Sequence, residues 1–118
     1  NHGHACFYKM GASSSFLVRN RQVKRIQHAA LPVGMVRRIK ASQIKIKLLP
    51  GDILIIVSDG ITDADRQDLE AKWLQEYLTN ISKNIDPKTL AGEIAGIAQS
   101  KYKSRQTDDI TVLAIQIR

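Results

Sequence analysis

The carboxylate best placed for chemistry is Asp59. It follows the aliphatic run Ile53–Val57 after a single serine, and Gly60 comes directly behind it. An uninterrupted aliphatic run fits a strand that is buried on both faces, and a carboxylate at the end of such a strand is held by a rigid scaffold. The glycine lets a ligand approach the backbone closely. Taken alone, the same tripeptide also fits a turn in which the aspartate caps the next segment.

A second acidic cluster, Asp108 and Asp109, stands immediately before an alternating apolar segment at residues 110–117. Adjacent carboxylates repel each other unless a cation or a basic group compensates them, although an acid pair in a solvent-exposed turn is the alternative reading. If the strands beside the two clusters are neighbours in one sheet, Asp59 and Asp108 converge on one hard cation. Such cations prefer oxygen ligands.

The rest of the pattern predicts an α+β chain. Apolar residues at three- and four-residue spacing predict a helix over residues 68–82. Asp86 as N-cap and Pro87 at the first helical position predict a second helix over residues 87–101. Asn20 marks a tight turn. Alternating or continuous apolar runs predict strands over residues 5–10, 15–20, 22–27, 43–48, 53–57 and 110–117.

Composition limits the classes of protein to which the chain can belong. The single Cys6 excludes an internal disulfide framework, and the longest aliphatic run is too short to span a bilayer, so we expect a soluble, cytoplasmic chain. The net charge of +7 is uneven, because residues 1–50 hold ten Lys and Arg and no acid. This basic half fits a solvated sheet face or a surface for an anionic protein partner. Nucleic acid is not expected, because no aromatic side chains interleave with the basic ones.

Four segments, in this order and at these separations, resemble a known family: residues 7–20 (FYKMGASSSFLVRN), 31–35 (LPVGM), 50–64 (PGDILIIVSDGITDA) and 107–115 (TDDITVLAI). The chain resembles the bacterial PPM (PP2C-like) serine/threonine protein phosphatases of the sporulation and stress-response type, most closely the stage II sporulation protein E group. The resemblance implies a partial PPM fold, in which antiparallel β-sandwich strands are flanked by an antiparallel helix pair. Residues 1–118 are then the C-terminal portion of a single phosphatase domain.

The resemblance also implies a metal site. In this family the aspartate of S-D-G and the first aspartate of D-D-x-T coordinate Mn²⁺ or Mg²⁺, which assigns catalytic and metal-binding roles to Asp59 and Asp108. Asp109 is then a neighbouring structural residue. Relatives usually carry Glu where this chain has Asp63, a departure that leaves the metal assignment unchanged. The implied mechanism uses two metal ions to orient and activate a water that attacks the phosphorus of phosphoserine in line.

One residue of the family pattern is absent. These phosphatases carry an early aspartate that bridges both metals, and no acid precedes Asp52 here. The two-metal site is therefore incomplete, and we expect the chain by itself to bind metal weakly and to have little or no activity. Half a domain also leaves apolar surface and strand edges uncovered, which predicts a homodimer or strand exchange.

Two functions follow from the sequence. The first is a metal-dependent phosphatase that dephosphorylates a phosphoserine regulatory protein, such as an anti-sigma-factor antagonist, and so controls a sporulation sigma factor. The resemblance implies a membrane-anchored protein whose phosphatase domain is cytoplasmic, although residues 1–118 contain no membrane segment. The alternative is a non-catalytic interaction module, in which the basic half docks an acidic or phosphorylated partner.

Overall fold

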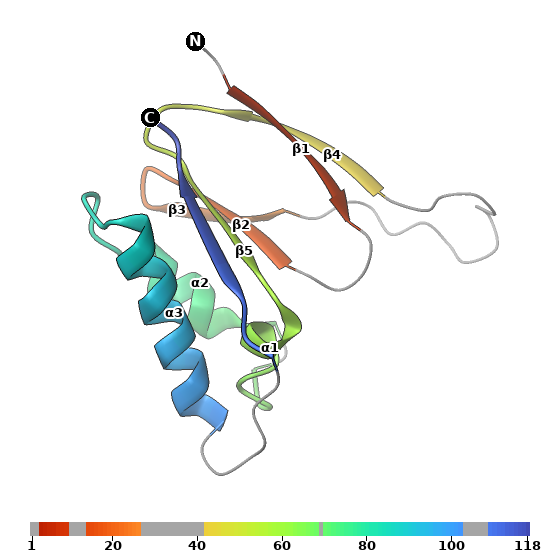
Figure 1. Ribbon diagram of the computed structural model, residues 1–118, viewed down its shortest axis with the longest axis vertical. Helices are drawn as coiled ribbons and strands as arrows, with labels where there is room; N and C mark the ends of the chain where they lie inside the picture. The colour runs from red at the N-terminus through yellow and green to blue at the C-terminus, as the bar shows by residue number, and fades with distance from the viewer. Residues whose placement is uncertain (1–2, 10–13, 27–41, 69, 103–108) are drawn as a thin grey trace, which may run out of the picture.

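The computed structural model describes residues 3–9, 14–26, 42–68, 70–102 and 109–118, with side chains placed in 14–26, 46–68, 70–102 and 109–118. The described strands form two antiparallel sheets (Figure 1). One sheet pairs β1 (Gly3–Lys9) with β4 (Ser42–Leu48). The other has the order β3-β2-β5-β6 and consists of β2 (Ser14–Arg19), β3 (Gln22–Ile26), β5 (Ile53–Val57) and β6 (Val112–Gln116).

The six described strands confirm the sequence prediction, with bounds that differ by at most two residues. The predicted ends at residues 10 and 27 lie outside the described residues. The turn between β2 and β3 is confirmed, since Asn20 and Arg21 have φ values of 50° and 63°. Two successive residues with positive φ are typical of the type I′ turn, whose twist matches a two-residue hairpin.

Three helices are present in the described part of the chain: α1 (Asp59–Thr62), α2 (Lys72–Thr79) and α3 (Pro87–Tyr102). The prediction for α3 is confirmed. The Asp86 carboxylate accepts a hydrogen bond from the Thr89 amide at 3.2 Å, as an N-cap does.

The prediction of a helix over residues 68–82 is wrong at both ends. Ala71 has a left-handed backbone with φ 54°, which a continuous helix does not allow. Asp68 lies outside the helix and caps it, because its carboxylate accepts hydrogen bonds from the amides of Lys72 at 2.9 Å and Trp73 at 2.8 Å. The buried face predicted for this helix is nevertheless correct at Leu74 and Leu78, which are both fully buried.

Apolar side chains pack on both faces of the four-stranded sheet. Helices α2 and α3 lie on one face, where Ile53, Ile55 and Val57 of β5 join the main core, and the β1–β4 ribbon lies on the other side (Figure 1). Leu54 packs there with Leu48 of β4 in a second apolar cluster. The structure thus confirms that β5 is a strand buried on both faces, and that the fold is α+β.

A partly buried ion pair joins the strand ends at the end of the sheet opposite α1. Arg19, the last residue of β2, donates from Nε to Oδ1 of Asp52 at 2.9 Å and from Nη2 to Oδ2 at 2.6 Å. The same Asp52 carboxylate accepts from the Leu49 amide at 2.8 Å, and Arg19 also donates to the Lys47 carbonyl. Asp52 is only 1% exposed. The Arg19 hydrogen bonds and charge, with the Leu49 amide, lower the pKa of Asp52 below its ordinary value although burial opposes this.

Among the residues that the structure describes, no helix has the length and apolar character needed to cross a membrane.

Candidate metal centre

The pairing of β5 with β6 brings Asp59 and Asp109 to the same end of the sheet. The strands are antiparallel, with Val57 opposite Val112. Asp59 follows the end of β5, and Asp109 precedes the start of β6, so both leave the sheet at the same end. The condition on which the sequence hypothesis depended, neighbouring strands in one sheet, is therefore met.

Ser58 joins the two segments. Its amide donates to the Thr111 carbonyl at 3.0 Å, and its hydroxyl accepts from the Thr111 amide at 2.9 Å. The hydroxyl also donates to the Asp109 carbonyl at 3.0 Å. These three bonds hold residues 109–111 beside the residue immediately before Asp59. Asp108 itself lies outside the described residues. The role of Ser58 was missed by the sequence analysis, which considered only the carboxylates.

Asp59 occupies the first position of α1, and its side chain is half-buried. Its main-chain carbonyl accepts hydrogen bonds from the Asp63 amide at 2.8 Å and the Thr62 hydroxyl at 3.3 Å. Within the described residues, its carboxylate has no hydrogen-bond or ion-pair partner. The backbone of this turn is thus satisfied internally, while the carboxylate oxygens stay available to a ligand.

These donors fit a hard divalent cation in kind. Carboxylate oxygens are the ligands that Mn²⁺ and Mg²⁺ prefer, and Asp59 presents two of them. In the described part of the chain no group of three or more His, Cys, Asp or Glu side chains is arranged to hold a metal ion. The arrangement is therefore suited to contribute part of a metal site.

Helix α3 fixes the turn that carries Asp59. The buried Tyr102, at the last position of α3, donates from its hydroxyl to the Gly60 carbonyl at 2.5 Å. A short hydrogen bond inside a low-dielectric core is strong. This bond joins α1, the turn at the end of β5, to helix α3. Tyr102 is therefore a positioning residue for Asp59.

This contact makes a testable prediction for Tyr102→Phe. Loss of the hydroxyl leaves the Gly60 carbonyl without this donor, and α1 is then held less firmly; we expect Mn²⁺ affinity to fall about tenfold, as for other residues that orient metal ligands. The measurement is a calorimetric titration of Mn²⁺ into a full-length phosphatase domain that contains this chain. Tyr77→Phe is the matched control, since it removes the 2.6 Å bond from Tyr77 to Glu93 between α2 and α3. Equal Mn²⁺ affinities in the two variants would show that Tyr102 is merely structural.

Some of the basic residues in positions 1–50 make structural contacts within the fold. Arg25 donates to the Ser14 hydroxyl at 2.8 Å and to the Glu70 carbonyl at 3.2 Å, and its guanidinium lies 5.6 Å from the centre of the Phe16 ring. Arg25 therefore ties β3 to the segment before α2. With Arg19 engaged by Asp52, at least two of the ten basic residues in positions 1–50 have structural partners.

Comparison with known proteins decides the family. The whole chain, residues 1–118, matches the family described as stage II sporulation protein E (SpoIIE). The chain belongs to the stage II sporulation protein E family. The SpoIIE protein of Bacillus subtilis is 28% identical over 94% of this chain, and that of Priestia megaterium is 25% identical over 95%. The aligned segments make up 13% and 19% of those two proteins.

Solved structures show the fold. The phosphatase domain of SpoIIE from B. subtilis, in a crystal form without domain swapping, superposes with a TM-score of 0.82 at 26% identity and matches 96% of this chain. The serine/threonine phosphatase PstP/Ppp of Mycobacterium tuberculosis gives a TM-score of 0.70 at 15% identity, which is evidence for the fold alone. The chain spans 50% and 55% of the lengths of these two structures. Its architecture matches that of part of a PP2C-like phosphatase domain.

Proposed function

We propose that this chain contributes Asp59 and Asp108 to the active site of a metal-dependent protein serine/threonine phosphatase. The observation that supports the proposal is the β5–β6 register, which brings Asp59 and Asp109, the described neighbour of Asp108, to the same end of the sheet in a SpoIIE-family chain. A metal-holding role for Asp59 accounts for a half-buried carboxylate that has no partner within the described residues.

The metal would be Mn²⁺ or Mg²⁺, held by the carboxylates of Asp59 and Asp108. One of the related crystal structures, the SpoIIE phosphatase domain, was presoaked with Mn, which supports this class of ion. When bound, such ions supply a nucleophilic water at neutral pH and charge that offsets the phosphoryl oxygens. The role of this chain is to hold its two carboxylates rigidly at one end of the sheet. Ser58 bonds to residues 109–111, and Tyr102 bonds to the turn that carries Asp59.

The substrate that we propose is a phosphoserine on a small regulatory protein of the anti-sigma-factor-antagonist type, in the control of a sporulation sigma factor and in the cytoplasm. The family relationship supports this proposal. The chain spans about half of the matched phosphatase domains, and no acid precedes Asp52 to act as the metal-bridging carboxylate. Activity is therefore to be measured on a phosphatase domain of full length that contains this chain.

The test is Mn²⁺-dependent release of phosphate from a phosphoserine protein by that domain. Release that requires Mn²⁺ supports the phosphatase. No release from any phosphoserine protein, with the domain folded and Mn²⁺ present, favours the alternative of a non-catalytic interaction module whose carboxylates are vestigial.

We also propose that the chain by itself forms a homodimer through β6. This strand is at the edge of the described four-stranded sheet, and Leu113 and Ile115 on it are 50% and 39% exposed. Exposed apolar side chains on a strand edge promote edge-to-edge pairing. We expect light scattering at high protein concentration to report a dimer, and Leu113→Lys to shift the chain to a monomer because charges at an edge oppose pairing.

Ser100→Lys, on the exposed surface of α3, is the control for the added charge and should stay dimeric. A wild-type chain that is strictly monomeric at high concentration would contradict the proposed dimer.

A further inference from the structure

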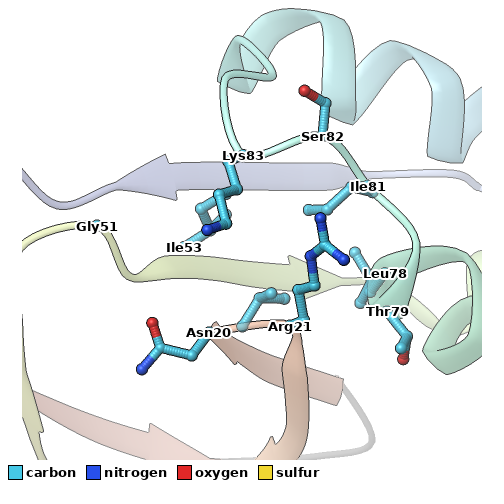
Figure 2. A pocket seen from close by; sticks show the side chains of 10 residues that line it. Asn20, Arg21, Gly51, Ile53, Leu78, Thr79, Ile81, Ser82 and Lys83 are labelled. Carbon is cyan, nitrogen blue, oxygen red and sulfur yellow. The ribbon is translucent and has the colours of Figure 1, made fainter.

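A pocket of about 200 Å³ lies beside the start of β5, and Figure 2 shows the side chains that line it. Gly51 and Ile53, before and at the start of β5, line it, whereas Asp59 comes after the last residue of the strand. At about 3.3 Å per residue, Ile53 and Val57 alone are roughly 13 Å apart. The pocket is therefore separate from the candidate metal centre, and its role does not depend on the proposed phosphatase activity.

The floor of the pocket is apolar. Val18, Ile53 and Leu78 line it from β2, β5 and α2, and these side chains are at most 6% exposed. Ile81, which follows α2, is partly buried against the same core. The floor thus consists of core side chains that are already held in place by packing, so a ligand would meet a preformed apolar surface.

The rim of the pocket is cationic. Arg21 and Lys83 belong to the lining, both are exposed, and the lining includes no Asp or Glu. Figure 2 shows the two side chains extending over the pocket from different segments, the β2–β3 turn and the connection between α2 and α3. Neither cation has an ion-pair partner within the described residues. Two uncompensated positive charges beside an apolar floor are complementary to an apolar group flanked by anions.

The backbone conformation of Arg21 also indicates a ligand site. Its φ of 63° lies in the left-handed region, where the second central position of a type I′ turn favours glycine. A long cationic side chain at this position is not explained by the stability of the turn. Residues held in such sparsely populated backbone conformations concentrate at ligand sites.

We propose that this pocket anchors an acidic segment of a protein partner, with one apolar side chain on the floor and flanking carboxylates beside Arg21 and Lys83. The volume supports a peptide anchor, because pockets for drug-sized molecules run from about 300 to 1,000 Å³ and this one holds about one side chain. The net charge of +7 on the chain attracts the same acidic partner over a longer range.

The test uses the peptide acetyl-Glu-Asp-Leu-Asp-Glu-amide, titrated into the chain while the methyl resonances of Ile53 and Ile81 are followed by NMR. We expect these resonances to shift, and the same peptide with Ser in place of Leu to bind several-fold more weakly because it lacks the apolar anchor. Arg21→Gly should weaken binding about threefold, the effect of removing one exposed charge contact. Glycine suits the left-handed turn position, so this variant keeps the fold.

Lys88→Ala, an exposed cation in the first turn of α3, is the matched control and should leave the affinity within the error of the wild type. Equal affinity for the Leu and Ser peptides would show attraction by net charge alone and would overturn the proposal. The absence of methyl shifts at Ile53 and Ile81 would overturn it too, as would equal weakening by Arg21→Gly and Lys88→Ala.

Discussion

Asp59→Asn in a full-length phosphatase domain that contains this chain is expected to lower Mn²⁺-dependent phosphate release at least about 100-fold. Changes at residues that only orient metal ligands cost about 10- to 100-fold, and the loss of a direct ligand costs no less. The amide keeps the shape of the side chain and removes its charge. The turn should persist in the variant, because the α1 bonds of this residue use its main-chain carbonyl and not its carboxylate.

The control for this substitution is Asp63→Asn, which removes the same charge one turn away at an exposed position. We expect Asp63→Asn to retain activity, and thermal unfolding of both variants to stay close to the wild type. If Asp59→Asn releases phosphate as fast as Asp63→Asn, then Asp59 is not a metal ligand but an ordinary turn residue.

Asp52→Asn is expected to lower the free energy of unfolding by about 2 kcal/mol at pH 7. Hydrogen bonds to charged groups contribute about 1.5–3 kcal/mol each, but Arg19 is 36% exposed on its side chain, so water compensates part of the loss. The buried carboxylate joins β2, β5 and the residue that follows β4, through Arg19 and Leu49. The measurement is urea unfolding at a fixed protein concentration, with Asp63→Asn expected to stay within about 0.5 kcal/mol of the wild type.

The pH dependence of this effect has a definite sign. Because the folded pKa of Asp52 is lowered, its charged form stabilises the fold at pH values above the unfolded pKa of about 3.9. As the pH falls below that value and through the folded pKa, the carboxylate becomes protonated in both states and this contribution is lost. The difference between wild type and Asp52→Asn should therefore shrink below about pH 4. A difference that is the same at pH 7 and pH 3 would contradict a charged role for Asp52.

Much of the fold is visible in local pattern. The apolar run of β5 predicts burial on both faces, and Ile55 and Leu54 do pack on opposite sides of the sheet. The capping signal at Asp86 predicts the start of α3 correctly. These elements follow from sequence because their periodicity and capping are set by residues close together in the chain.

Where the prediction was wrong or incomplete, contacts between residues far apart in the chain determine the structure. Spacing alone extends α2 back to residue 68, because helical periodicity continues through Ala71, whose left-handed backbone interrupts the helix. The local pattern gives no signal for the role of Asp52, because its partner Arg19 is 33 residues away. The contacts that shape the candidate site, from Ser58 and Tyr102, likewise cross from one element to another and leave no local signal.

The site assignment rests on motif order and on the sheet register. The pattern placed two aspartates beside two strands, and the structure pairs those strands with Val57 opposite Val112. Asp59 is described, whereas Asp108 lies outside the described residues, so the joint role of the two carboxylates stays a prediction.

The measurement that tests this joint role most directly is a calorimetric titration of Mn²⁺ into the full-length domain and into Asp59→Asn, Asp108→Asn and Asp63→Asn variants. We predict that the Asp59 and Asp108 substitutions each weaken the same binding event at least about 10-fold, because changes at residues that only orient metal ligands already cost that much, while Asp63→Asn binds as the wild type. Wild-type Mn²⁺ affinity in either the Asp59 or the Asp108 variant would contradict a shared metal site.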